Sequence, residues 1–305
     1  MKFSFSKYVW FDGKLVPLNM AMVPVTTHAI HYGTSIFEGI RVYWNSKNLY
    51  VFRLKDHIKR FRNSGKFYNI MLNFSDKQIE NAVIDLCKKN RIKKSSYIRP
   101  FYFVGQYGIN LHVTRKAPTH TAIFAFPFGN LFNKNGITAT TSKWRKFSDM
   151  STPTQAKMGG NYLNSILATQ DVKQKGFDEA ILLDQSGNVS EAPGENIFLV
   201  KNDELVTPPL SSSALDGITR RSIITLAKDM NLKIKIRKVS KKELKLADEI
   251  FLSGTAAEIT PITKIDKKKI GGGKVGNITK LFMNTYSDIV MNKNENYSHW
   301  LTMVY

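Results

Sequence analysis

The stretch Thr154-Gln155-Ala156-Lys157-Met158-Gly159-Gly160-Asn161-Tyr162-Leu163-Asn164-Ser165 places one lysine among small residues and two glycines. An apolar run typical of a helix follows it. Partial desolvation in a tight, glycine-lined backbone lowers the pKa of a lysine and frees its amine, so Lys157 is a candidate Schiff-base former. A surface lysine in a loop is the plainer interpretation, and this stretch alone favours it. The rest of the sequence decides between the two.

The length of 305 residues is enough for two domains with ample cores. The polar run between Gly129 and Gly136 predicts a linker at 129–136, between a small N-terminal domain (1–128) and a larger C-terminal domain (137–305). The single cysteine, Cys87, excludes a disulfide framework, and the first eleven residues lack the apolar core of a signal peptide. We therefore expect a cytoplasmic protein.

The net charge of +21 raises the alternative of a nucleic-acid-binding protein. Lysine supplies most of it, with 34 lysines and 11 arginines scattered along the chain. The densest runs, Lys241-Lys242 and Lys267-Lys268-Lys269, are short and have no interleaved aromatic residues for base stacking. No apolar run reaches the ~18 residues that would span a bilayer. We expect a solvated basic surface, with no nucleic-acid or membrane partner.

In the first half of the chain, Asp12-Gly13 between apolar runs predicts a hairpin, and 40–52 predicts a second one. Apolar residues at helical spacing predict a helix over 54–67. Ser75 and Gln78 form a capping box for another helix. Aromatic and β-branched residues predict strands over 97–104 and 121–126.

In the second half, strands and helices alternate. We expect helices over 162–175 and 278–291, and a third that Thr219 caps and that runs to Met230. A short helix follows Ser240. Strands are expected over the following ranges: 137–141, 180–183, 196–200, 204–206, 234–239 and 249–252.

Two segments have the composition of phosphate-binding turns. Leu215–Arg220 combines glycine, a hydroxyl and backbone amides at a predicted helix N-terminus, and Ser253–Ala256 offers similar groups after a strand. Either segment alone is weak evidence, because most Gly-Thr turns only reverse the chain. A glycine-rich run at 271–273 before Lys274 lacks the upstream glycine of a P-loop.

Three other groups of polar residues admit two interpretations each. A carboxylate within Ser190–Asn196 could accept a hydrogen bond from a protonated ring nitrogen, or could lie in a solvated loop. Tyr97 and Arg99 share one strand face and suit carboxylate recognition, or they form an exposed face. His28 and His31 lack further ligands at metal spacing, so we expect no metal site.

The sequence resembles the branched-chain aminotransferases of the class-IV, fold-type-IV pyridoxal-phosphate group. The resemblance extends from Tyr8 to about Thr285 and rests on six motifs that occur in the same order. The motifs are Phe37–Arg41, Tyr97–Pro100, Ala156–Tyr162, Ser190–Asn196, Gly217–Arg220 and Ser253–Glu258. The resemblance implies an α+β enzyme of two domains, similar in fold to D-amino-acid aminotransferase. It also implies a small N-terminal α/β domain and a larger C-terminal domain with a mixed sheet or pseudo-barrel.

The resemblance also implies pyridoxal 5′-phosphate as the cofactor and transamination between L-leucine, L-isoleucine or L-valine and 2-oxoglutarate. This reaction would be the last step of branched-chain amino-acid biosynthesis. Lys157 would bond to the cofactor and move the substrate proton, Glu191 would pair with the pyridine nitrogen, and Tyr162 would bind the phenolic oxygen. The phosphate would be held by Arg60, the turn of Gly217, Ile218 and Thr219, and the turn of Gly254 and Thr255.

For the substrate, the resemblance implies carboxylate binding by Tyr97 and the turn of Thr255 and Ala256, with Arg99 and Tyr32 accepting the second carboxylate of glutamate. The remaining pocket residues would be Phe37, Gly39, Ile109, Leu111 and Phe128. Tyr32 and Leu111 would reach across the interface of a homodimer or larger homo-oligomer.

Two positions depart from the pattern of bacterial relatives, which carry tryptophan and tyrosine where this chain has Phe128 and Leu131. These changes affect the preference among leucine, isoleucine, valine and aromatic substrates and leave the cofactor residues intact. A D-amino-acid transaminase or an aminodeoxychorismate lyase would use the same lysine. The Tyr97–Pro100 and Gly39–Arg41 motifs favour the branched-chain enzyme.

Overall fold

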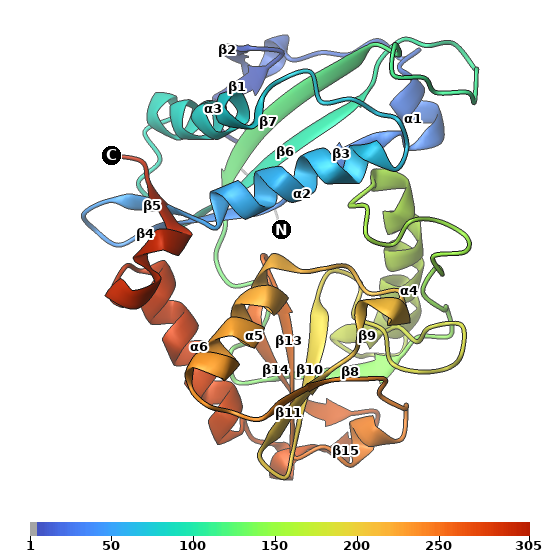
Figure 1. The fold of residues 1–305 in the computed structure, drawn as a ribbon, viewed down its shortest axis with the longest axis vertical. Helices are drawn as coiled ribbons and strands as arrows, with labels where there is room; N and C mark the ends of the chain where they lie inside the picture. The colour runs from blue at the N-terminus through green and yellow to red at the C-terminus, as the bar shows by residue number, and fades with distance from the viewer. Residues whose placement is uncertain (1–4) are drawn as a thin grey trace. The chain divides into compact units, whose positions relative to one another are not determined.

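The computed structural model describes residues 5–305, and the chain divides into two compact units (Figure 1). Unit 1 comprises residues 1–129, 156–160 and 288–305, and unit 2 comprises 130–155 and 161–287. The first crossing from unit 1 to unit 2, after Gly129, falls at the start of the expected linker. Two segments expected in the C-terminal domain, 156–160 and 288–305, lie in unit 1, because they pair with strands and a helix of that unit.

Unit 1 is built on an eight-stranded antiparallel sheet. Its order is β16-β5-β4-β6-β7-β1-β2, with β3 also paired to β6. The strands are β1 (Tyr8–Phe11), β2 (Lys14–Pro17), β3 (Ser35–Phe37), β4 (Ile40–Trp44), β5 (Leu49–Phe52), β6 (Ser96–Val104), β7 (Thr119–Pro127) and β16 (Leu301–Met303). The helices are α1 (His28–Tyr32), α2 (Leu54–Lys66) and α3 (Asp76–Lys89).

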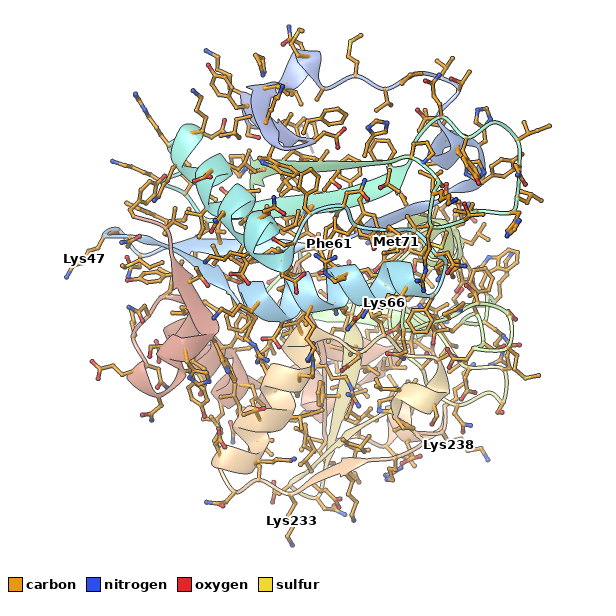
Figure 2. All side chains as sticks on the ribbon, turned by 45° about the horizontal axis from the view of Figure 1, so that its top comes forward. Lys47, Phe61, Lys66, Met71, Lys233 and Lys238 are labelled. Carbon is orange, nitrogen blue, oxygen red and sulfur yellow. The ribbon has the colours of Figure 1, made fainter. Side chains whose placement is uncertain are left out.

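The core of unit 1 lies where α2 and α3 cover one side of this sheet (Figure 1). Phe61 of α2 and Leu86 of α3 are fully buried with strand residues such as Ile98. The Ser75 capping box begins α3 as predicted, and Asp12 and Gly13 both have positive φ in the first hairpin. In Figure 2, Phe61 lies along α2, whereas Lys47 projects from the β4–β5 turn.

Unit 2 is built on a mixed eight-stranded sheet in the order β12-β11-β10-β13-β14-β8-β9, with β15 added beside β14. Three of its pairs are parallel: β11–β12, β14–β8 and β8–β9. The strands are β8 (Ile137–Thr141), β9 (Glu179–Ile181), β10 (Asn196–Lys201), β11 (Glu204–Thr207), β12 (Ile234–Ile236), β13 (Glu249–Gly254), β14 (Glu258–Ile265) and β15 (Lys268–Lys269). Its helices are α4 (Tyr162–Gln174), α5 (Ile218–Asp229) and most of α6 (Asn277–Val290).

Aliphatic residues of the unit 2 sheet, such as Ile197 and Leu252, form its main core. A second contact joins Phe251 of β13 to Phe282 of α6, whose ring centroids are 5.8 Å apart. Helices combined with two sheets make this an α+β fold, as the sequence predicted. The expected cap at Thr219 is wrong: Gly217 is the N-cap residue, and Thr219 lies inside α5. Among residues 5–305, no helix is both long and apolar enough to cross a membrane.

Candidate active site

Lys157 is held by unit 1, although the residues on either side of 156–160 belong to unit 2. Its carbonyl oxygen accepts a hydrogen bond from the amide of Phe37 at 3.1 Å, next to a β-bridge between Ile36 and Met158. Its own amide donates to Ser64 Oγ of α2 at 3.0 Å. The lysine backbone is therefore fixed from both sides, to β3 and to α2.

The glycines after Lys157 allow this close approach. A Cβ on Gly159 would lie 2.3 Å from Ser35 Oγ, which is far inside contact distance. The amide of Gly160 donates to the carbonyl of Gly33 at 3.2 Å, and Gly33 has a φ of 65°. The glycine-lined backbone that the sequence indicated is thus a requirement of packing against β3.

The amine of Lys157 lies in a cationic, partly buried environment. Its nitrogen is 4.7 Å from the centre of the Phe37 ring. Burial, followed by the nearby Arg60 guanidinium, lowers the pKa of Lys157 to about 8, although Glu38 partly opposes the shift. At pH 7 roughly a tenth of an amine with this pKa is uncharged, against about 0.03% of an ordinary lysine, and this fraction can act as a nucleophile or a base.

Tyr97 and Arg99 of β6 contact each other near the Lys157 amine, and we call the residues around this amine the Lys157 group. Arg99 Nη2 donates to Tyr97 Oη at 3.4 Å, and the guanidinium lies 4.8 Å from the Phe37 ring centre. A Cβ on Gly39 would lie 1.7 Å from Tyr97 Oη, so glycine is needed for the tyrosine to occupy this position. Within the described chain, Arg99 Nε is buried without a hydrogen-bond partner, which is the state expected of a group that binds a ligand.

Phe128 joins the same group. Its ring centroid is 5.4 Å from that of Tyr97, and the guanidinium of Arg41 lies 5.0 Å from the Phe128 ring centre. In contrast, Tyr32, Ile109 and Leu111 are exposed, with Ile109 at 85% of its full accessible surface. Tyr32 Oη donates to the Ile109 carbonyl at 3.5 Å. Tyr32 and Ile109 are therefore joined at the surface, and Leu111 is exposed two residues further along the chain.

In unit 2, Glu191 is the centre of a hydrogen-bonded cluster. Its Oε2 accepts from Asn196 Nδ2 at 3.1 Å and from the Leu215 amide at 2.9 Å. Its Oε1 pairs with Lys146 Nζ at 2.7 Å. A carboxylate offers about four acceptor positions, so three of these four are occupied by donors of this chain. Glu191 is buried and oriented, which excludes the solvated-loop interpretation of 190–196.

Lys146 is the site residue that the sequence analysis missed. Burial lowers the pKa of its ammonium, but the adjacent Glu191 carboxylate outweighs this effect and raises the pKa above the usual value. Tyr162, the first residue of α4, is close enough to Lys146 to favour its charged form as well. Nothing in the local sequence Lys143-Trp144-Arg145-Lys146 distinguishes this lysine from its neighbours.

The turn before α5 offers backbone amides for an anion. Gly217, its N-cap residue, provides no side-chain cap, and both Ile218 and Thr219 are buried in the first turn of the helix. A Cβ on Gly217 would lie 2.0 Å from Asn196 Oδ1, so this turn packs directly on the Glu191 cluster. An uncapped helix N-terminus favours a phosphate or carboxylate.

The second predicted phosphate turn follows β13. Thr255 and Ala256 are half-buried in the turn between β13 and β14, and Gly254 packs against Glu195. Ser253 Oγ is buried and has no hydrogen-bond partner among the described residues. The end of β13 and the turn after it therefore provide a glycine, a threonine hydroxyl and a serine hydroxyl without a hydrogen-bond partner among the described residues.

The chain is similar to known proteins over most of its length. The family model for amino-transferase class IV matches residues 35–265. The branched-chain-amino-acid aminotransferase of Escherichia coli (strain K12) is 41% identical over 301 residues, which cover 97% of each chain. The chain belongs to the class IV aminotransferase family.

Two solved structures are also similar over nearly the whole chain. A branched-chain aminotransferase from Thermoproteus uzoniensis, determined with norvaline, is 41% identical with a TM-score of 0.95, covering 98% of this chain and all of that one. The branched-chain amino acid aminotransferase of Thermobaculum terrenum, determined in its PLP form (holo-form), is 33% identical with a TM-score of 0.93. Coverage there is 99% of this chain and 99% of the other.

Each unit by itself has residues that fit one part of a phosphorylated pyridoxal. Such a ligand needs an amine for its aldehyde, an acceptor for its ring nitrogen and donors for its phosphate. Lys157 offers an amine of lowered pKa, Glu191 one remaining acceptor position, and the start of α5 uncapped amides. Within residues 5–305, no cluster of three or more metal-ligating side chains is present.

Proposed function

We infer that this chain is a branched-chain-amino-acid aminotransferase, which moves the amino group between L-leucine, L-isoleucine or L-valine and 2-oxoglutarate in a reversible ping-pong reaction. The observation that carries the inference is Lys157. It is anchored to β3 and α2, and its amine has a pKa lowered to about 8. The near-full-length similarity to enzymes named for this reaction supports the choice of substrate.

We propose pyridoxal 5′-phosphate as the cofactor. When bound, it supplies an aldehyde carbon and an electron-withdrawing ring. Lys157 would bond to the aldehyde carbon, Glu191 would accept the pyridinium N–H, and Tyr162 would donate to the phenolic oxygen. The phosphate would be held by Arg60, the Gly217, Ile218 and Thr219 turn, and the Gly254 and Thr255 turn.

During the reaction Lys157 acts as the proton carrier. An amine with a pKa of about 8 can take the proton from the substrate Cα and later return it. Glu191 would keep the ring nitrogen protonated, and this would stabilise negative charge that forms when the substrate proton is removed. Lys146, Asn196 and the Leu215 amide keep the Glu191 carboxylate in place for this purpose.

The substrate carboxylates are bound by the Tyr97 and Arg99 group and by the turn of Thr255 and Ala256. Arg99 can bind the second carboxylate of glutamate, and its buried Nε supports this role. Phe37, Gly39 and Phe128 form the apolar wall for the branched side chain. With phenylalanine at 128 and leucine at 131, this wall lacks the tyrosine hydroxyl of bacterial relatives, so we expect a changed preference among substrates.

We also propose a homodimer or larger homo-oligomer, in which Tyr32, Ile109 and Leu111 of one copy complete the site of another. An open groove of about 350 Å³ on unit 1 supports this assembly. Its lining is largely aromatic and aliphatic, including Phe101, Phe124, Val23 and Ile30. Light scattering should give a dimer or larger species, and Ile30→Asp should shift it toward monomer, whereas a wild-type monomer contradicts the proposal. We further propose that the enzyme acts in the cytoplasm and in amino-acid biosynthesis.

The activity assay measures transfer from L-leucine, L-isoleucine, L-valine and D-alanine to 2-oxoglutarate. We expect turnover of the three L-amino acids and none of D-alanine. Turnover of D-alanine without L-leucine would assign the chain to a D-amino-acid transaminase instead, and no turnover of any amino acid would contradict the enzyme assignment.

A further inference from the structure

Glu38 is a fully buried carboxylate between β3 and β4, in the same group as Lys157. Its own amide donates to the Pro100 carbonyl at 2.8 Å, and the preceding residue, Phe37, donates to the Lys157 carbonyl. The backbone at Glu38 is therefore tied to β6 on one side and lies beside the lysine segment on the other.

The Glu38 carboxylate binds one edge of the Arg60 guanidinium. Oε1 accepts from Arg60 Nε at 2.6 Å, and Oε2 accepts from Arg60 Nη2 at 2.9 Å. This two-point contact fixes both the position and the plane of the guanidinium, which a single hydrogen bond would leave free to rotate. The guanidinium has a second edge, formed by Nη1 and Nη2, which points away from a carboxylate bound in this manner.

His57 supports the same carboxylate. Its Nδ1 lies 2.7 Å from Glu38 Oε2, and the ring is buried. Burial lowers the pKa of His57 despite the attraction of Glu38, so the ring is neutral and its Nδ1–H donates to the carboxylate. Because His57 and Arg60 are three residues apart on α2, one face of that helix supplies both donors.

The electrostatic balance favours a permanently ionised Glu38. Burial raises the pKa of this carboxyl, but Arg60 and His57 together overcome burial and hold the pKa well below its usual range. The buried anion and the Arg60 cation therefore compensate each other. Removal of the negative charge would leave the guanidinium both unbalanced and free to reorient.

The same helix links Arg60 to the lysine. Ser64 Oγ, which accepts from the Lys157 amide, donates to the Arg60 carbonyl at 2.9 Å. A phosphate held by Arg60 would therefore be at a fixed position relative to the Lys157 backbone. The Glu38 carboxylate fixes the plane of the Arg60 guanidinium on this helix.

We propose that Glu38, held in turn by His57, is a positioning residue that fixes the Arg60 guanidinium so that its second edge binds the cofactor phosphate. This inference rests on the proposed function and adds a specific consequence to it. Loss of Glu38 should weaken recognition of the phosphate rather than of the pyridoxal ring.

The test compares binding of pyridoxal 5′-phosphate with that of pyridoxal, which lacks the phosphate, to the cofactor-free protein by absorbance titration. Hydrogen bonds to charged groups correspond to about 10- to 100-fold in a dissociation constant. Glu38→Gln should weaken binding of the phosphorylated ligand by this factor and change pyridoxal binding by less than about threefold. Asp56→Asn is the matched control, because Asp56 lies on the same helix but pairs with Arg53; it should change neither.

A double-mutant cycle with Arg60→Gln completes the experiment. In the Arg60→Gln background, Glu38→Gln should cause no further loss of affinity for the phosphorylated ligand. Equal losses for both ligands, or additive effects of the two substitutions, would overturn the inference. If Glu38→Gln does not fold, His57→Gln, which leaves the Glu38–Arg60 pair intact, should show a smaller loss that is again specific to the phosphate, and the absence of such a loss would overturn the inference.

The outcome also separates this inference from the proposed function. A wild-type protein that binds neither ligand would contradict the proposed cofactor. A wild-type protein that prefers the phosphorylated ligand, with a Glu38→Gln variant of unchanged preference, would overturn only the role of Glu38.

Discussion

Lys157 and Lys146 are both largely shielded from solvent, yet their pKa values move in opposite directions. The pKa of Lys157 falls to about 8, because burial is reinforced by the nearby Arg60 cation. The pKa of Lys146 rises, because the Glu191 carboxylate at 2.7 Å outweighs burial. Burial alone therefore does not create a reactive lysine; the charge of the neighbouring group decides between a nucleophile and a structural cation.

The residues around Lys157 and the cluster around Glu191 also differ in their overall charge. In the Lys157 group, the Arg60 and Arg99 guanidinium groups lie near the lysine amine, and a buried carboxylate, Glu38, pairs with Arg60. In the Glu191 cluster, one cation and two uncharged donors hold one carboxylate. The excess of positive charge in the first group favours release of the lysine proton and attraction of anions. The second group instead presents an oriented negative charge.

The largest expected effect is that of Lys157→Ala. Removal of the proton carrier should lower kcat by roughly 10²–10⁴-fold or more and abolish the visible absorbance of the cofactor-loaded protein. Lys47→Ala is the control, since Lys47 is exposed at the β4–β5 turn (Figure 2) and should leave kcat unchanged. A Lys157→Ala enzyme within tenfold of the wild type would remove the distinction between the two lysines.

Glu191→Gln should have the next largest effect. The amide keeps the shape of the carboxylate but cannot hold the ring nitrogen protonated, so kcat should fall by about 10²–10³-fold. Steady-state kinetics with L-leucine measure the change. Glu204→Gln is a suitable control, because Glu204 pairs with the exposed Lys235 at the edge of the unit 2 sheet. If the Glu191→Gln variant has the kcat of the wild type, the Glu191 cluster serves only the structure and not the reaction.

The opposite pKa shifts predict different reactivity with pH. At pH 8 about half of the Lys157 amines should be uncharged, against roughly 0.3% for a lysine with the ordinary pKa of 10.5. Reductive methylation of the cofactor-free protein, read by peptide mass mapping, should therefore label Lys157 with a midpoint near pH 8. Lys146 should remain protonated and unlabelled at that pH. Labelling of both at the same pH would contradict the account.

The smallest effect concerns the glycine that shapes the Lys157 group. Gly39→Ala would place a Cβ 1.7 Å from Tyr97 Oη, so the tyrosine must move. We expect a loss of about 1–3 kcal/mol in the free energy of unfolding, measured by denaturant titration, together with a raised KM. At Gly129 an added Cβ meets no atom within 4 Å, so Gly129→Ala should change neither quantity.

The sequence was most informative where a local pattern determines local structure. The capping box at Ser75, the Asp12-Gly13 turn and the strand over 137–141 all follow from neighbouring residues. The glycines that follow Lys157 are likewise explained locally, because a Cβ on Gly159 would lie 2.3 Å from Ser35 Oγ. The predicted N-cap of α5, Thr219, was two residues too late. The N-cap is Gly217, where a side chain would collide with Asn196.

What the sequence could not provide is the partner of each buried charge. Glu38 and Arg60 are 22 positions apart, and Lys146 and Glu191 are 45 apart, so only the fold brings each pair together. The return of 156–160 to unit 1 was missed for the same reason: pairing with β3 has no signal in the segment itself. Among 34 lysines, Lys146 had no local feature to distinguish it.

The most direct measurement is reduction of the cofactor-loaded protein with borohydride, followed by peptide mass mapping. Reduction makes the bond between the cofactor and its lysine permanent, so the labelled peptide identifies the reactive amine. The account predicts a single pyridoxyl group on Lys157 and none on Lys146. A pyridoxyl group on Lys146, or on any lysine other than Lys157, would contradict it.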